Sequence, residues 1–347
     1  MSRYGYLRIG PNRYRERFGL SFEDVQPGLR IRHRPGIDIS QRDNHIDAVD
    51  LINNAHLHYD SHYAAQTEWQ EPLTVSTMTV QRFMGMISRS WYRRRGILGI
   101  DSLALTAPVR GDETLYSESE VLSVSGGDDP DVGVVALRIK GLNRAGGQIA
   151  CIECRIELYR RGCHPEDDPA LPVCTEDRFL LHHQDPDGTF VEQTGLFFED
   201  LAVGETFEHW PSRSLTIEES RLAALRSLEI NPRWHDAGFR ARHPNVPDMV
   251  WEPLVLGAVT ALTTRSFGRV VANLGWTGIE MPSPVAPGAS LLAESTIVAT
   301  RPSASRPDQG IATVDTRAFA DDRLVCRYTR NLLVYRRGMG PYVKAGY

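Results

Sequence analysis

The chain has 347 residues, 24% of them charged, with a formal net charge of −5 and a pI of about 6.1. This length is enough for two domains that each bury a core. The acidic balance argues against a nucleic-acid-binding protein, which needs a broad basic surface. No apolar run approaches the roughly 20 residues that cross a bilayer, and the first residues lack the apolar core of a secretory signal. We therefore expect a cytoplasmic protein with neither nucleic acid nor membrane as a partner.

The chain repeats itself at a fixed distance. Gly19–Asp24 (GLSFED) returns as Gly195–Asp200 (GLFFED), and Tyr159–Gly162 (YRRG) returns as 335–338; both offsets are 176 (195 − 19 and 335 − 159). Such self-similarity indicates a duplicated unit. We predict an N-terminal unit over 18–160 and a C-terminal unit over 195–338. The Pro-rich residues 161–194 are expected to form an irregular linker.

Each copy is expected to hold the same elements in the same order, and the second copy shows them most plainly. A helix should begin at Thr216, with Glu219 three residues later in the pattern of a capping box. A second helix over about 253–268 is apolar almost all round and should be buried. Four strands are expected to follow, over about 271–281, 290–300, 310–320 and 327–336. This order predicts an α+β unit in which an antiparallel sheet wraps a long helix.

Five cysteines without a secretory signal do not suggest a disulfide framework. Cys151 and Cys154 have the spacing of a redox or zinc site, but they lie in a segment that alternates like a strand. Residues three apart on a strand point to opposite faces. We therefore predict that this pair is structural.

The segment richest in chemically active side chains lies between the two helices of the first copy. It contains Asn53, Asp60 and three histidines, His56, His58 and His62. His58 and His62 have a spacing that suits zinc on a helix, but no second cluster completes a coordination shell. No metal site is predicted here.

The sequence His58-Tyr-Asp60-Ser-His-Tyr63-Ala64 resembles the His-x-Asp-x-x-(Phe/Tyr)-Ala portion of the motif of MaoC-like, (R)-specific enoyl-CoA hydratases. This resemblance implies a double hot dog fold and a hydro-lyase that adds or removes water across an α,β-unsaturated acyl-CoA thioester. It also implies that no metal or redox cofactor is needed. The second copy, through Phe197–Asp200 and Val271–Trp276, resembles mesaconyl-CoA hydratases. This narrower resemblance implies mesaconyl-CoA or 2-methylmalyl-CoA as a substrate.

In that family an Asp five residues before the motif His works with it on a catalytic water. Here His58 occupies the His position and Asn53 the Asp position. The second copy has Glu229 and Trp234 at these places, so neither copy has the full pair. Trp234 makes the second copy the degenerate half, because an indole fills the space of a substrate carbon.

The replacement of the family Asp by an amide leaves two catalytic interpretations open, and the alternative to both is a site that has lost its activity or catalyses a changed reaction. Syn addition of water needs one group to take a proton and one to return it. His58 can titrate near neutrality, whereas Asn53 can only orient water. Either His58 is both base and acid, or a carboxylate such as Asp60, Asp50 or Glu68 supplies the second function.

The resemblance also places groups that contact the substrate. Amides around Thr74, Val75 and Ser76, at the start of the first buried helix, should stabilise the thioester oxygen. Arg93, Arg94 and Arg95 are candidates for binding the CoA phosphates or a substrate carboxylate through charge-assisted hydrogen bonds. The alternative for this basic run is a solvated surface.

Two other functions fit the same fold. One is a thioesterase, which releases free thiol, and the other is a non-catalytic binder of acyl-CoA or acyl-carrier protein. Hot dog units usually pair through their sheets, so the double unit is expected either to act as a pseudo-dimer by itself or to assemble further into a homodimer.

Overall fold

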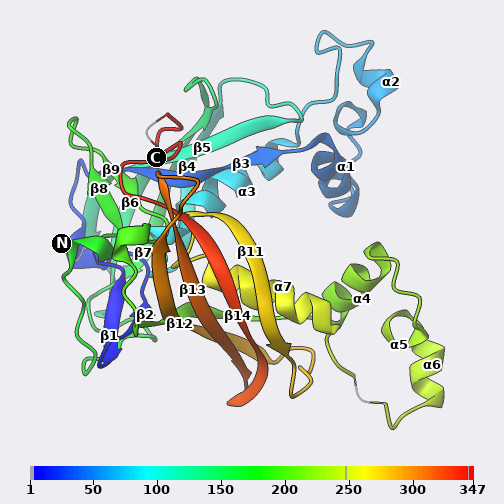
Figure 1. Cartoon of the computed structure of the whole chain (residues 1–347). Helices are drawn as coiled ribbons and strands as arrows, with labels where there is room; N and C mark the ends of the chain where they lie inside the picture. The colour runs from blue at the N-terminus through cyan, green and yellow to red at the C-terminus, as the bar shows by residue number, and fades with distance from the viewer. Residues whose placement is uncertain (1–3, 247, 343) are drawn as a thin grey trace.

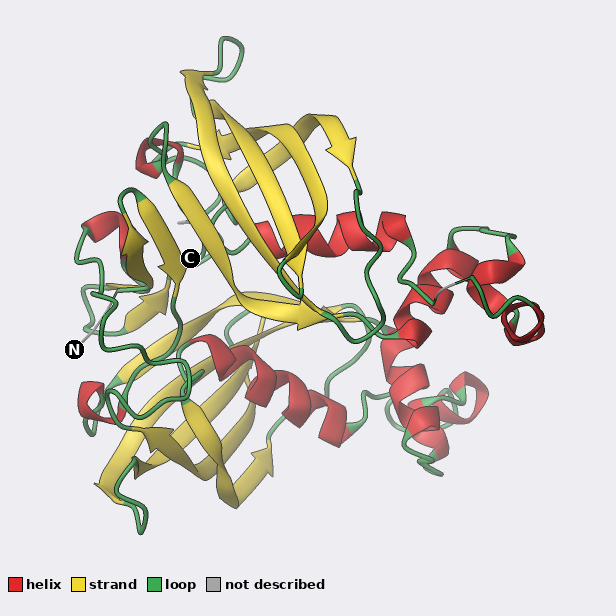
Figure 2. Cartoon of the chain, turned by 90° about the horizontal axis from the view of Figure 1, so that it is seen from below, coloured by secondary structure: helices red, strands yellow, loops and turns green. Residues whose placement is uncertain are grey.

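The computed structural model describes residues 4–246, 248–342 and 344–347, and it contains two sheets that each curve around one helix (Figures 1 and 2). In the first unit the helix is α3 (Ser76–Met86). The unit's own strands are β3 (Arg30–Ile39), β4 (Arg94–Leu105), β5 (Glu113–Gly126), β6 (Val132–Asn143) and β7 (Gln148–Tyr159). They lie in the antiparallel order β4-β7-β6-β5-β3.

The second unit repeats this plan around α7 (Glu252–Thr263). Its strands are β10 (Thr206–Ser214), β11 (Val270–Glu280), β12 (Ser290–Pro302), β13 (Gln309–Ala320) and β14 (Arg323–Tyr335). Their order is β11-β14-β13-β12-β10, which corresponds strand for strand to the first unit. The predicted double hot dog fold is confirmed, and the four predicted strands are present within a few residues. α7 ends before the predicted Gly268.

The central helices are held by close packing on their sheets. In α3, Met78 and Phe83 are completely buried, and in α7 Val255 and Val259 are buried in the same way. Gly141 in β6 permits this approach, because a Cβ there would lie 2.2 Å from the Phe83 ring. A larger residue at position 141 would therefore push α3 away from its sheet.

Each sheet is extended by a hairpin that precedes the other unit. β1 (Tyr6–Gly10) and β2 (Arg13–Glu16) join the second sheet, where β2 runs parallel to β10. From the linker, β8 (His182–Gln184) and β9 (Phe190–Glu192) join the first sheet, where β9 runs parallel to β3. The expectation of an irregular linker is wrong over this hairpin. Short strands of this kind form because a neighbouring sheet edge accepts them, and local sequence does not reveal that edge.

The remaining helices are short. Four are single 3₁₀ turns in the body of the two units: η1 (Phe22–Asp24), η3 (Ile87–Arg89), η4 (Asp177–Phe179) and η5 (Phe198–Asp200). The others form two arms that project from one end of the molecule (Figures 1 and 2). The arm of the first unit contains α1 (Gln41–Asp50), η2 (His56–His58) and α2 (Ser61–Ala64). The arm of the second unit contains α4 (Ile217–Arg226), α5 (Pro232–His235) and α6 (Ala237–Arg242). The predicted capping box of Thr216 and Glu219 is present at α4.

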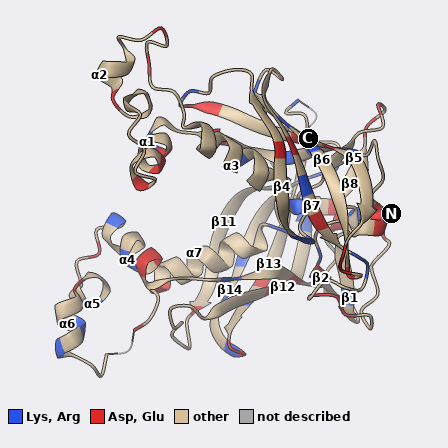
Figure 3. Cartoon of the chain, turned by 180° about the vertical axis from the view of Figure 1, so that it is seen from behind, with Lys and Arg blue, Asp and Glu red and all other residues tan. Residues whose placement is uncertain are grey.

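Charges of both signs are spread over both units (Figure 3).

Cys151 and Cys154 both lie in β7, and Cys154 is buried whereas Cys151 is partly exposed, as strand alternation predicts. Within the described ranges, no helix has the length and apolar character needed to cross a membrane.

Candidate active site

His58 ends the single turn η2 and is held in one orientation by the backbone. Its Nδ1 lies 2.9 Å from the carbonyl oxygen of Leu73. A carbonyl oxygen only accepts hydrogen bonds, so Nδ1 carries the proton and donates it. In the neutral imidazole, Nε2 is then the basic nitrogen. The half-buried side chain can therefore present a base on the side away from Leu73.

Asn44, from α1, organises the backbone around His58. Its side chain is completely buried, and its Nδ2 donates to the carbonyl oxygens of His58 (2.9 Å) and Leu73 (3.0 Å). Its Oδ1 accepts from the N–H of Val75 at 2.7 Å. One amide thus connects the histidine turn with the start of α3. The sequence analysis did not single out Asn44, because a lone Asn on a polar helix carries no local signal.

A pocket of about 300 Å³ lies at the N-terminus of α3. It is lined by residues from the segment that leads into α3, from the start of that helix, from the end of β4 and the turn after it, and from β7: Trp69, Leu73, Thr74, Ser76, Thr79, Leu105, Thr106, Ala107, Pro108, Val109 and Ile149. Most of these side chains are apolar. The volume and the lining suit a short acyl chain.

The N–H groups near this pocket are only partly free. Thr74 N–H donates to the carbonyl oxygen of Val109 at 2.9 Å, and Val75 N–H donates to Asn44. The N–H groups of the first turn of α3, from Ser76 onward, have no acceptor one turn back. Among the described residues, the buried hydroxyl of Thr74 has no hydrogen-bond partner. Unused donors therefore gather where the dipole of α3 is positive.

Asn53 and Asp60 are bonded to their own local backbone. Asn53 Oδ1 accepts from Ala55 N–H at 2.9 Å, and Asp60 Oδ1 accepts from Tyr63 N–H at 2.9 Å as the N-cap of α2. In the second copy, Glu229 makes the bond that corresponds to that of Asn53, to the N–H of Asn231. In both copies, the side chain at this position therefore stabilises a turn by accepting a hydrogen bond from the backbone two residues later.

Trp234 takes the place of the histidine in the second copy and is buried there. It packs with Ala224, Met249 and Trp251 in a small cluster at the base of the second arm. An indole at this place has no basic nitrogen.

Within the described ranges, no group of three His, Cys, Asp or Glu side chains is arranged to hold a metal ion.

The arginine run is largely committed to internal ion pairs. Arg93 is buried and pairs with Asp167, and Arg95 pairs with Asp129 and Glu157. Arg94 begins β4, and burial lowers the pKa of its guanidinium. These pairs neutralise two of the three charges that were predicted to bind CoA phosphates.

Two buried networks of the same kind lie between the swapped hairpins and the sheets. In the first, His33 in β3 contacts Glu192 at 2.9 Å and Ser119 at 2.8 Å, and Ser90 also donates to Glu192. The second network consists of His209, Glu16, Ser295 and Ser266. Every member lies 176 residues from its counterpart, so the repeat itself carried a signal for these residues. Because the residues of both networks are buried, we assign them a structural role, in which they hold the two units together.

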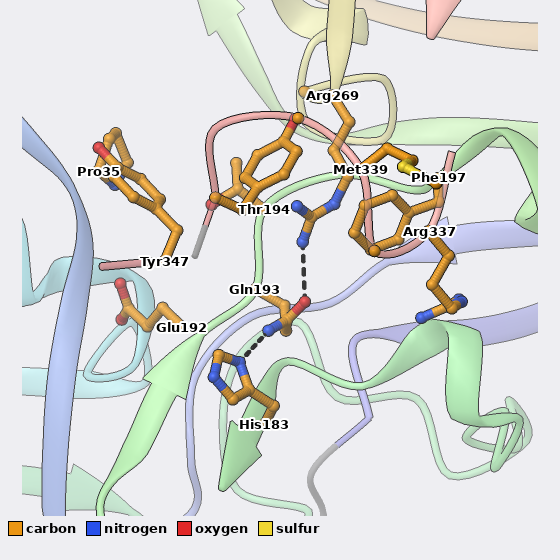
Figure 4. A pocket seen from close by; sticks show the side chains of 14 residues that line it. Pro35, His183, Glu192, Gln193, Thr194, Phe197, Arg269, Arg337, Met339 and Tyr347 are labelled. Carbon is orange, nitrogen blue, oxygen red and sulfur yellow. Dashed lines mark hydrogen bonds between the residues drawn. The ribbon is translucent and has the colours of Figure 1, made fainter. Parts of the chain in front are cut away.

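A cavity of about 400 Å³ lies beneath the C-terminal residues (Figure 4). Arg269 lies against it, stacked on the rings of Phe197 (3.9 Å) and Tyr342 (4.4 Å). Its Nη2 donates to Gln193 Oε1 at 2.8 Å, as Figure 4 shows. These contacts occupy the guanidinium, so the arginine fastens the C-terminal segment to the linker.

Comparison with known proteins supports the predicted relationship. Residues 182–341 match the family model described as mesaconyl-CoA hydratase. A mesaconyl-CoA hydratase of Haloarcula hispanica is 29% identical over 182 residues, which are 49% of this chain and 48% of the relative. One of Haloarcula marismortui is 27% identical over 176 residues, with the same coverage. The resemblance to hydratases is confirmed. The match spans about half the length of these curated relatives.

Two solved structures are similar over most of the chain. A MaoC domain protein dehydratase from Chloroflexus aurantiacus has 18% identity and a TM-score of 0.41, covering 92% of this chain and 98% of that one. A Mycobacterium tuberculosis protein described as a double hot dog has 19% identity and a TM-score of 0.38, covering 91% and 99%. The fold of the present chain is established by its own strand order.

Proposed function

We propose that the protein is an acyl-CoA hydratase or dehydratase that works through His58 in the first copy. The observation that carries this proposal is the bond from His58 Nδ1 to the Leu73 carbonyl oxygen. It leaves Nε2 as the base, next to a residue that lines the pocket at the start of α3. In hydration, Nε2 takes a proton from the water that attacks Cβ, and the imidazolium then returns a proton to Cα.

The thioester oxygen gains negative charge while Cβ is attacked. We assign its stabilisation to the first turn of α3, starting with the N–H of Ser76, because those of Thr74 and Val75 are already used. Backbone donors fixed at a helix N-terminus stabilise such a charge without reorganising. This assignment keeps Ser76 from the sequence prediction and shifts the set of donors by two residues, from a start at Thr74 to a start at Ser76.

Asn53 and Asp60 stay predictions as catalytic groups. Their hydrogen bonds to Ala55 and Tyr63 support a role in shaping the turn that carries His58. The arrangement favours the interpretation in which His58 alone serves as base and acid. For the substrate, the match to the mesaconyl-CoA hydratase model supports mesaconyl-CoA or 2-methylmalyl-CoA.

We propose a homodimer that pairs through the outer strands of the sheets. β4 ends the first sheet and β11 ends the second. Both expose apolar side chains, among them Ile97, Leu98 and Ile100 on β4, and Leu274, Trp276 and Ile279 on β11. Apolar edge strands without a partner readily pair with another chain.

The test follows the absorbance of the conjugated enoyl thioester after the protein is mixed with crotonyl-CoA or with mesaconyl-CoA. We expect the band to disappear with the wild type, and His58→Ala to lose a factor of about 10² or more. His62→Ala is the matched control, since it removes an exposed histidine four residues away. Turnover near normal in His58→Ala would overturn the assignment. Release of free thiol would identify a thioesterase, and binding without turnover would identify a binder.

A further inference from the structure

A second pocket, of about 620 Å³, lies where the two units meet. It is lined by four arginines, Arg34, Arg82, Arg89 and Arg265, together with the aromatic rings of Phe18 and Tyr92. Arg89 and Arg265 occupy equivalent places in the two copies, because their numbers differ by 176 (265 − 89). The duplication therefore brings both members of one repeated pair to the same pocket.

The positive charge of this pocket is not balanced locally. None of its lining residues is acidic, and none of the four arginines forms an ion pair with any residue in the described ranges. The carboxylates near these arginines have other hydrogen-bond partners, and one of them, Glu166, accepts from the hydroxyl of the lining residue Tyr92 at 2.9 Å. Glu118, near Arg34, pairs with Arg32, whereas Glu16, near Arg265, accepts from Ser266. The pocket therefore differs from the Arg93 to Arg95 run, where acidic partners are present.

The arginines are half-buried and partly positioned in advance. Arg34 donates from Nε to the Gly346 carbonyl oxygen at 2.9 Å and lies 4.8 Å above the Tyr116 ring. Arg89 lies 5.1 Å above the Phe18 ring, and its buried Nε has no partner among the described residues. Burial lowers the pKa of both Arg34 and Arg265. Cations that are desolvated in this way without a counter-charge favour an anionic ligand.

We infer that this pocket binds the phosphate groups of an adenosine phosphate and, resting on the proposed function, those at the nucleotide end of the acyl-CoA substrate. Its volume fits a nucleotide, since ligand pockets commonly span about 300–1,000 Å³. Arginines suit phosphate oxygens because their planar donors bind them in pairs. Phe18 and Tyr92 are partly exposed, and their rings offer faces on which an adenine can stack.

α3 connects this pocket with the proposed acyl site. Ser76 and Thr79, in its first half, line the smaller pocket, whereas Arg82 and Gly85, in its second half, line the larger one. The rise of a helix places Ser76 and Gly85 about 14 Å apart along the axis. One extended thioester would therefore run along α3, with its acyl group at one end and its phosphates at the other.

The experiment compares the wild type with Arg82→Gln and Arg89→Gln in two assays. Calorimetry measures the binding of adenosine 3′,5′-bisphosphate, and steady-state kinetics measures KM and kcat with crotonyl-CoA and with mesaconyl-CoA. Arg301→Gln is the control, since it removes the same charge at an exposed position outside the pocket. We expect each pocket variant to weaken bisphosphate binding, and to raise KM, by about tenfold, the effect of losing one charge-assisted hydrogen bond. kcat should stay within about twofold, and Arg301→Gln should match the wild type.

The outcomes separate this inference from the proposed function. Bisphosphate binding that is absent, or equal in all four proteins, would overturn the inference even if the wild type hydrates both thioesters. Arginine-dependent binding in a protein without turnover would support the phosphate site and count against the proposed function. Arginine-dependent binding with an unchanged KM would show that a separate nucleotide uses the pocket, and would overturn the assignment to the substrate.

Discussion

Replacing Glu192 with Gln should destabilise the protein strongly, because this buried carboxylate joins the linker hairpin to the first unit. Glu192 accepts from His33 Nδ1 at 2.9 Å and from the N–H groups of Ser90 and Arg34, both at 3.0 Å. In the side chain that this change creates, one carboxylate oxygen is replaced by an NH2 group. That group donates hydrogen bonds and would face the donors that the carboxylate oxygen accepted from. Breaking a buried ionic or strongly hydrogen-bonded pair costs about 3–5 kcal/mol, and we expect a loss of this size in the free energy of unfolding.

Glu16→Gln is the internal control, because the repeat supplies the same network with looser geometry. Glu16 lies 3.5 Å from His209 Nδ1 and 3.2 Å from Trp210 N–H. These longer contacts predict a smaller loss, of about 1–3 kcal/mol. Urea unfolding followed by circular dichroism at pH 7 gives both values. A loss below about 1 kcal/mol for Glu192→Gln, or a larger loss for Glu16→Gln, would refute this reasoning.

The effect of Glu192 should also depend on pH in a defined direction. Burial alone would raise the pKa of this carboxyl, but His33, His182 and Ser90 hold it below its usual value. A carboxylate with a depressed pKa in the folded state stabilises above its unfolded pKa of about 4.3, and this contribution disappears as the pH falls through the folded value. The difference in stability between wild type and Glu192→Gln should therefore be full at pH 7 and should shrink below about pH 4. An equal difference at pH 3 and pH 7 would contradict the assigned direction.

Four further changes test the site and the assembly. Asn53→Asp should keep or raise hydration of simple enoyl thioesters, since a carboxylate can also accept from Ala55 N–H; a large loss of kcat would argue for a specific amide role. Trp234→His should not add a second active site in an active-site titration, and it should destabilise the second arm by about 2–3 kcal/mol through the lost indole packing. Asn44→Ala should lower the free energy of unfolding by about 3 kcal/mol and reduce kcat, because it frees both the His58 turn and the start of α3; unchanged kcat would show that Asn44 does not position the site. Leu274→Lys should shift a dimer toward monomer in light scattering, whereas an unchanged mass would place the interface elsewhere.

The sequence by itself determined the duplication, the order of elements and the type of fold. The offset of 176 joins words at both ends of the unit, and periodicity located α7 and the four strands that follow it. These features depend on neighbours close in the chain, such as the bond between Thr216 and Glu219. The motif also led to His58, because the residues that resemble the hydratases are contiguous.

The tertiary structure decided which residues act together across the copies. Only the fold shows that Glu192 meets His33, that Asn44 binds both His58 and Leu73, and that Arg89 and Arg265 share a pocket. Glu16 and Glu192 are separated by the repeat offset of 176 (192 − 16), but this spacing does not show that each belongs to the sheet of the other unit. That exchange depends on which sheet edge is free to accept a hairpin, and this is a property of the folded molecule rather than of any local stretch of sequence.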